Sequence, residues 1–371
     1  MQQIDKSWQV CILRGIDMKE NLLFQAGPEA LEIIRDKGLS AEDIDIIPGA
    51  AGGPKWLVLS RIDRALFGEF LKDRKRPLFL IGSSIGSWRF AAATQKNFHK
   101  AIDAFEDAYI NQRFLTKPSA QEITDVSIGV LDAFINEQGT RDALNHPYLR
   151  INMFADLGKG LMRSSTKGAL MLGLGLSAFL NLFSRKGMGR FFSRTLFYDG
   201  RDLPPFFDLK DFPTTKVALT PQNIKQALLG SGSIPAVMQS SDNISGAPEG
   251  KYWDGGMIDY HIDIPFNSKG LVLYPHFFTE IIPGWFDKYV PWHNQTKKYL
   301  SKHVLVSPSP EFIASLPMKK VPDRRDFYHF AKRDDERVAC WRDVVERCRV
   351  LEDEFLESVY SGSIKRKVRG F

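Results

Sequence analysis

A serine between two glycines gives this chain its first candidate for chemistry. The residues Gly82-Ser83-Ser84-Ile85-Gly86 have the spacing G-x-S-x-G and follow the apolar run Pro77 to Ile81. An alanine-rich helical segment comes next, so the motif has the strand-turn-helix context in which Ser84 would be a nucleophile on a strained turn. Gly82 and Gly86 are expected there because a side chain would collide with the neighbouring strand and helix. A purely structural glycine turn is the alternative interpretation.

A glycine-rich loop, Ala50-Ala51-Gly52-Gly53-Pro54-Lys55, precedes this motif. It follows the apolar segment Ile44 to Ile47, so in a parallel sheet it would lie at the same edge as Ser84. Backbone amides there can stabilise the oxyanion of a tetrahedral intermediate, and a lysine adds positive potential. The predicted oxyanion and substrate-binding residues are Gly52, Gly53, Pro54, Lys55 and Ile85. A plain turn or a phosphate-cradling loop are alternatives, although the G-x-x-x-x-G-K-[ST] pattern of nucleotide binding is missing.

A carboxylate stands in a third motif, Trp253-Asp254-Gly255-Gly256. An Asp-Gly pair alone is a common hairpin signal. What changes this interpretation is that the motif occurs together with the serine turn and the glycine loop.

The elements that must position these motifs alternate along the chain. Residues 28–38 have helical spacing, a strand leads into the glycine loop, a helical segment follows, and a second strand leads into Ser84. Strands that alternate with helices indicate a parallel sheet with helices on its faces. The sequence therefore predicts an α/β fold, a three-layer α/β/α sandwich around a mainly parallel sheet.

In this order the three motifs resemble the patatin-like phospholipase family, whose pattern is a glycine-rich oxyanion loop, a G-x-S-x-G elbow and a later D-G-[GA]. The segment 228–235, LLGSGSIP, also resembles the small-residue stretch that precedes the last motif in that family. The resemblance covers about residues 44 to 100 and 214 to 266. The loop departs from the family's G-G-G-x-[RK]-G, because Ala51 replaces the first glycine and Trp56 the last.

The resemblance implies a serine acyl hydrolase with a patatin-like fold and a Ser-Asp dyad. Ser84 would attack a lipid acyl ester, Asp254 would accept its proton, the glycine loop would hold the oxyanion, and water would release the acyl enzyme. Neither a metal nor another cofactor is expected, and transfer of the acyl group to another alcohol stays open.

Two alternatives belong to different classes. One is an α/β-hydrolase esterase with a Ser-Asp-His triad, because histidines follow Asp254 in the required order. The candidates are His261, His276, His303 and His329. The other is a non-catalytic protein that binds lipid surfaces and retains the fold.

Composition limits the other function classes. The chain has 371 residues, a net charge of +6 and three cysteines. Three scattered cysteines form neither a disulfide framework nor a zinc site, which favours a reducing compartment. The start of the chain lacks the pattern of a signal peptide, so we expect a cytoplasmic protein, peripheral at the membrane. Since no nucleic-acid-binding motif accompanies the basic residues, nucleic acid is not an expected partner.

One segment, 161–190, differs from the rest. Its apolar stretch, Gly168 to Phe183, is too short to span a bilayer and lies between basic clusters, which predicts a lid or a membrane contact. The flanking cations are Arg163, Lys167, Arg185, Lys186 and Arg190. A buried helical hairpin is the alternative. We predict a single domain over 1–371, with this insertion at 155–200.

A helical extension is predicted over 320–371. One face of a helix through 334–360 carries the apolar residues Val338, Trp341, Val344, Val345, Cys348, Leu351, Phe355 and Val359. This stripe is expected to be core or a partner seam, and the basic tail after it a solvated end.

Overall fold

The computed structural model describes residues 20–115, 117–293 and 299–371. Cys11 and the N-terminal segment on which the signal-peptide prediction depends lie outside the described residues. Cys340 and Cys348 are free thiols.

A single mixed sheet runs through the molecule in the order β11-β1-β10-β9-β2-β3-β4-β5-β6, with β8 on β4 and β7 on β8. The bounds of its strands are β1 Leu22–Ala26, β2 Ile44–Gly49, β3 Leu78–Ser83, β4 Leu149–Gly158, β5 Phe192–Tyr198, β6 Thr214–Ala218, β7 Ser241–Asp242, β8 Lys251–Asp254, β9 Leu271–Pro275, β10 His303–Pro308 and β11 Arg369–Gly370. The central strands β10, β9, β2, β3 and β4 are all parallel. The α/β fold class predicted from the sequence is thereby confirmed.

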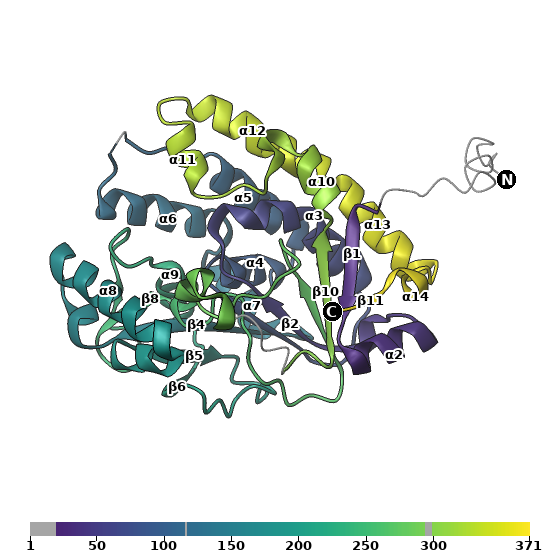
Figure 1. Cartoon of the computed structure of the whole chain (residues 1–371), viewed down its shortest axis with the longest axis horizontal. Coiled ribbons are helices and arrows are strands. Elements are labelled where there is room, and N and C mark those ends of the chain that lie inside the picture. Colours follow the sequence, from purple (N-terminus) through teal and green to yellow (C-terminus); the bar gives the residue numbers. More distant parts are fainter. Residues whose placement is uncertain (1–19, 116, 294–298) are drawn as a thin grey trace.

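Helices cover the sheet and extend to the periphery (Figure 1). Their bounds are α2 Pro28–Lys37, α3 Ser60–Asp63, α4 Ile85–Ala93, α5 Phe98–Ile110, α6 Ala120–Phe134, α7 Glu137–Asn145, α8 Lys167–Phe183, α9 Ile224–Gly232, α10 Pro310–Ser315, α11 Arg325–His329, α12 Asp334–Arg347, α13 Arg349–Tyr360 and α14 Ile364–Lys367. The glycine loop continues into a 3-10 helix, η2, Gly53–Leu59. Two more short 3-10 helices, η6 Gly255–Met257 and η7 Trp285–Tyr289, flank the candidate site.

Alternate residues of the central strands point to two different cores. Leu78 and Leu80 of β3 belong to the main core beneath the helices, whereas Ile81 faces a second core on the other side. This alternation follows from the period of two in a strand. The second core is closed largely by irregular chain, which contributes Phe206 and Ile264, so the third layer over β3 is not helical.

Strand register brings the motifs together at one edge of the sheet. Gly49 at the end of β2 pairs with Gly82 of β3, so the glycine loop and the serine turn leave the sheet side by side. β3 ends with Ser83 opposite Phe154 of β4, and β8 ends with Asp254 opposite the next residue of β4, Ala155. Strands β3 and β8 therefore meet end to end along β4, with Ser84 and Asp254 at the junction.

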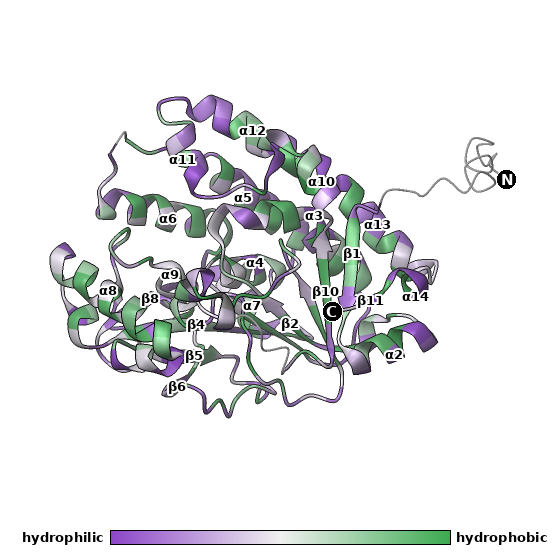
Figure 2. Cartoon of the chain, in the orientation of Figure 1, coloured by the Kyte–Doolittle hydropathy of each residue, from purple (hydrophilic) through white to green (hydrophobic). Residues whose placement is uncertain are grey.

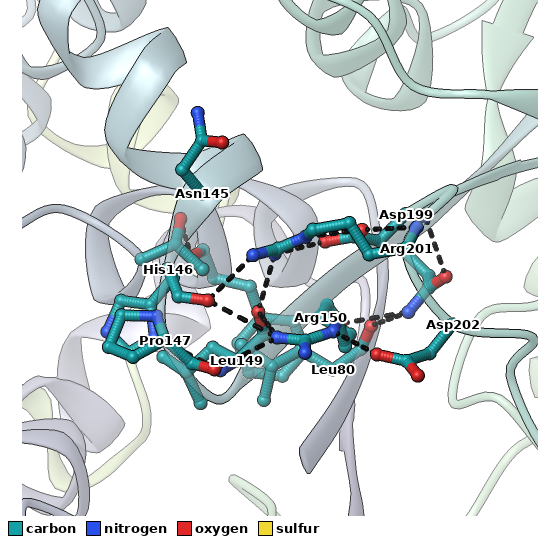
Figure 3. A network of polar contacts seen from close by, with 12 residues as sticks. Leu80, Asn145, His146, Pro147, Leu149, Arg150, Asp199, Arg201 and Asp202 are labelled. Carbon is teal, nitrogen blue, oxygen red and sulfur yellow. Dashed lines mark hydrogen bonds and ion pairs between the residues drawn. The ribbon is translucent and has the colours of Figure 1, made fainter. Parts of the chain in front are cut away.

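The far end of β4 is fixed by a polar network (Figure 3). Arg150 Nε donates to Asp202 Oδ2 over 2.5 Å, and Arg201 makes two bonds to Asp199. Arg201 also donates to the backbone carbonyl of His146 at 2.7 Å. Since these bonds tie the start of β4 to the chain after β5, they hold the strand along which β3 and β8 meet.

The insertion 155–200 begins inside β4 and includes β5, so part of it belongs to the central sheet. Between these strands, α8 packs through one narrow face, where Gly173 lies so close to Met162 that a Cβ would come within 2.8 Å of Sδ. The other face of α8 is apolar and exposed. Among the described residues, no helix is long and apolar enough to cross a membrane.

The apolar stripe predicted over 334–360 is core, as expected, because Trp341 and Phe355 are fully buried. The single helix predicted there is wrong in one respect: the chain breaks at Cys348 into α12 and α13. The basic tail is not a free end. Arg369–Gly370 forms a strand beside β1, and Lys367 Nζ donates to Glu354 Oε1 at 3.1 Å.

Candidate active site

Ser84 adopts the strained turn that the G-x-S-x-G motif predicts. Its backbone has φ 55° and ψ −127°, a conformation that residues with a Cβ rarely adopt. It immediately precedes α4, and only 4% of its surface is exposed. Positions where the fold holds a residue in a costly conformation are typical of functional sites.

The glycines of the motif are required by close approach. A Cβ on Gly86 would lie 2.0 Å from the carbonyl oxygen of Gly49, and one on Gly82 would lie 2.4 Å from the amide nitrogen of Ser87. A side chain at either glycine would therefore collide with the neighbouring strand or with the following helix, as the sequence predicts.

Asp254 contacts Ser84 directly. The Ser84 hydroxyl donates to Asp254 Oδ2 over 2.7 Å, and the amide of Gly256 donates to the other carboxylate oxygen over 2.8 Å. Burial raises the pKa of Asp254 above its ordinary value of 3.8, while Arg324 and the bond from Ser84 oppose that shift. The carboxylate is therefore a stronger base than an exposed aspartate.

Gly255 and Gly256 allow this placement. A Cβ on Gly255 would lie 2.3 Å from the carbonyl oxygen of Phe154, and one on Gly256 would lie 2.8 Å from Cβ of Ala51. The Asp-Gly-Gly motif thus packs against both β4 and the glycine loop, which explains why two successive glycines follow Asp254.

The glycine loop has two amides available to a ligand. Ala51 uses its amide to bond the carbonyl of Tyr260 at 2.8 Å. Gly52 and Gly53 do not donate to any described residue, and Gly53 has a φ of +56°. Trp56, where the family pattern has glycine, is fully buried and stacks on Phe105 with ring centroids 4.3 Å apart.

These motifs open onto one cavity of about 450 Å³. Ser84, Asp254 and Gly256 line it together with Gly52 and Lys55. The other predicted residues support these from behind and do not line the cavity within the described chain. They are Gly53, Pro54, Ile85, Gly82, Gly86 and Gly255.

No histidine of the described chain contacts Ser84 or Asp254. His261 and His276 are fully buried; His261 Nδ1 accepts from the amide of Ile282, and His276 Nδ1 bonds the carbonyl of Phe278. Burial lowers the pKa of His276 to about 3, so it stays neutral. His303 is buried in β10 and His329 is exposed on α11, and neither lines the cavity. No cluster of described Asp, Glu, His or Cys side chains could hold a metal ion.

Several residues of the site were missed by the sequence analysis. Ser231 Oγ accepts from the amide of Ser84 at 3.0 Å and donates to the carbonyl of Phe154 at 2.6 Å, which fixes the elbow. It lies within the segment LLGSGSIP, so that signal was present in the sequence. Tyr260, Lys288 and Arg324 also line the cavity, and no motif marks them.

The same segment supplies more of the site. The amide of Asp254 donates to the carbonyl of Ser233 over 2.7 Å, and Ile234 and Pro235 line the cavity.

Comparison of the sequence with models of known protein families gives no match, and comparison with curated proteins gives none.

Proposed function

We propose that this protein is a serine acyl hydrolase of the patatin-like phospholipase type, which cleaves fatty acyl esters through the dyad Ser84 and Asp254. The observation that carries the proposal is the 2.7 Å bond between the Ser84 hydroxyl and Asp254 Oδ2 at a strained strand-to-helix turn. The nearby cavity and the free amides of the glycine loop support it.

The geometry supports a mechanism in two halves. Ser84 Oγ attacks the ester carbonyl carbon as its proton passes to Asp254 Oδ2, and the amides of Gly52 and Gly53 stabilise the oxyanion. The tetrahedral intermediate then collapses, and the leaving alkoxide takes the proton from Asp254. Water attacks the acyl enzyme, gives a proton to Asp254, and the fatty acid leaves as Ser84 is reprotonated.

A dyad is favoured over a Ser-Asp-His triad because both oxygens of Asp254 are already engaged, one by Ser84 and the other by Gly256. A triad histidine would have to stand between the serine and the acid. The raised pKa of Asp254 lets the carboxylate act as the base without one.

We also propose that α8 contacts a membrane surface. Its exposed apolar residues are Met171, Leu172, Leu176, Phe179, Leu182 and Phe183. Figure 2 shows hydrophobic colour along this peripheral helix. Four of the five predicted flanking cations, Arg163, Lys167, Lys186 and Arg190, are exposed and complement anionic headgroups. The fifth, Arg185, instead pairs with buried Asp287 at 2.8 Å.

Hydrolysis of p-nitrophenyl acyl esters by Ser84→Ala and Asp254→Asn tests the dyad. Each variant should lose activity by about 10³-fold or more, because the nucleophile or its base is gone. An active-site serine probe should label the wild type and not Ser84→Ala. Circular dichroism provides the folding check.

Ser361→Ala is a control, because this serine is exposed after α13 and does not line the cavity. Activity that survives in Ser84→Ala would exclude the assigned nucleophile. A wild type that neither hydrolyses esters nor reacts with the probe would favour the non-catalytic lipid-binding alternative.

A further inference from the structure

Four cationic residues line the cavity beside the Ser84–Asp254 pair; Arg325 is exposed, and the other three are half-buried. Lys55 comes from the glycine loop, Lys288 from η7, and Arg324 from the turn before α11. Arg324 lies against the oxyanion loop, since a Cβ on Gly53 would come within 3.1 Å of its Nε. Three segments far apart in the sequence therefore bring positive charge to one place.

None of the three cations has a carboxylate partner among the described residues. Lys55 Nζ donates to the hydroxyl of Tyr260 at 3.1 Å, and Lys288 Nζ lies 3.7 Å from the centroid of the same ring. Arg324 makes neither a hydrogen bond nor an ion pair with the described chain. The neighbouring Asp323 also lines the cavity, and its Oδ1 accepts from Lys320 Nζ and from the amide of Arg325.

The arrangement is costly without an anion. Burial, together with repulsion from Lys55 and Arg324, lowers the pKa of Lys288 to about 7, and burial lowers that of Lys55 to about 8. Of the two carboxylates that line the cavity, Asp254 is hydrogen-bonded to Ser84, and the attraction of Asp323 for Lys55 does not offset the effect of burial. Half-buried cations that repel one another are stabilised when a ligand supplies the missing negative charge.

We propose that the cavity recognises an ester that also carries an oxyanionic group, a phosphate or a carboxylate, held by Lys55, Lys288 and Arg324 next to the scissile bond. This inference rests on the proposed function and adds the substrate class to it. A guanidinium can bond two oxygens of such a group at once, and the two ammonium groups add point charges. A neutral glyceride would leave all three cations unpaired.

The three cations could otherwise act on the tetrahedral oxyanion itself. In that case they would accelerate every ester, whether or not the substrate is charged. The two roles therefore differ in one measurable property. In an anion site the cations favour charged ligands over neutral ones, whereas in an oxyanion role they act on both alike.

Binding to the Ser84→Ala variant tests the inference without catalysis. Titration calorimetry would compare hexyl phosphate, hexanoate and hexanol, which share one chain and differ in the charged group. We expect at least one of the two anions to bind about tenfold or more tightly than hexanol. The tighter anion identifies the group as phosphate or carboxylate, and equal binding of all three ligands would overturn the inference.

The second arm removes the charges singly, as Lys288→Gln and Arg324→Gln in the Ser84→Ala background. Each should weaken binding of the anion by roughly 10- to 100-fold, the range for a charge-assisted hydrogen bond, and should affect hexanol much less. Arg324→Lys keeps the charge and should retain part of the affinity. Lys210→Gln, an exposed lysine outside the cavity, removes the same charge and should have no effect.

Turnover separates this inference from the proposed function. With active wild type, release of fatty acid from 1-acylglycerol 3-phosphate and from the matching monoacylglycerol should differ by at least about tenfold in kcat/KM, in favour of the phosphate. Arg324→Gln should reduce that preference. Equal losses on both esters would overturn the anion site while leaving the dyad intact, whereas anion binding without turnover of any ester would contradict the hydrolase and retain the site.

Discussion

The backbone of Ser84 is held in a conformation that works against the stability of the fold. A residue with a Cβ in such a region costs of order 1–3 kcal/mol, and the surrounding contacts must enforce it. Here the amide of Ser84 bonds Ser231 Oγ, and the close packing of Gly86 on Gly49 leaves the turn no room to relax. The hydroxyl is thereby directed at Asp254.

Two substitutions of Ser84 measure this strain. Both Ser84→Gly and Ser84→Ala lose the bond to Asp254, but only glycine can adopt φ 55° without cost. We expect Ser84→Gly to have the higher free energy of unfolding, by about 0.5–2 kcal/mol after the greater entropy of an unfolded glycine is subtracted. Urea unfolding at neutral pH provides the measurement.

Ser87, inside α4, is the matched position with helical backbone. There the order should reverse, with glycine less stable than alanine by about 1 kcal/mol. If glycine were also the less stable residue at position 84, the turn would not be strained in solution.

At the scale of the element, α8 differs from a core helix because one of its faces is apolar and exposed. Phe179 and Phe183 are 55% and 76% exposed, and their rings contact each other with centroids 5.4 Å apart. On the opposite side of the helix, Asn181 Nδ2 donates to buried Asp287 Oδ1 at 2.7 Å. The helix is therefore fixed to the body of the protein, and Leu174 reaches the cavity.

The double variant Phe179→Ser/Phe183→Ser tests the membrane contact. Each aromatic ring that enters a lipid interface contributes about 1.5–3 kcal/mol, so the variant should bind vesicles of phosphatidylglycerol and phosphatidylcholine at least about tenfold more weakly. Sedimentation of vesicles with bound protein gives the affinity. Leu203→Ser/Tyr328→Ser changes two residues outside α8 that are 68% and 84% exposed, and this variant should bind as the wild type does. If both double variants bound equally, α8 would not be the contact.

The sequence identified the parts of the site that depend on local geometry. Ser84, Gly82 and Gly86 lie within one turn, where sterics alone require those residue types. Lys288 and Arg324 could not be found in this way, because only tertiary packing brings their segments to the cavity. The break at Cys348 was missed for a related reason, since the apolar stripe continues across it and periodicity reports a face, not continuity.

At the scale of the whole molecule, the helical extension is joined to the helices of the main core by a buried aromatic cluster. Trp341 of α12 is fully buried, stacks near Tyr109 of α5, and donates from Nε1 to Asp326 Oδ2 at 2.9 Å. Asp326 follows Arg324 by two residues, so this packing also holds one wall of the cavity.

Trp341→Ala should lower the free energy of unfolding by about 3–5 kcal/mol, because it leaves a large cavity and removes a buried hydrogen bond. Tyr360→Ala, an exposed aromatic in the same extension, should change it by less than about 1 kcal/mol. Urea unfolding followed by circular dichroism should show a single transition in each case, as the predicted single domain requires. Two transitions, with only one sensitive to Trp341→Ala, would divide the chain into separate units.

The position of β1 in the sheet has a consequence for synthesis on the ribosome. Its two neighbours, β10 and β11, follow it in the chain after nearly all the rest of the sheet. A nascent chain therefore exposes β1 as an unpaired, apolar strand while the intervening residues are made, and such edges promote association with other chains. Arg324 follows β10 in the chain, so the cavity also lacks this wall until synthesis has passed that residue.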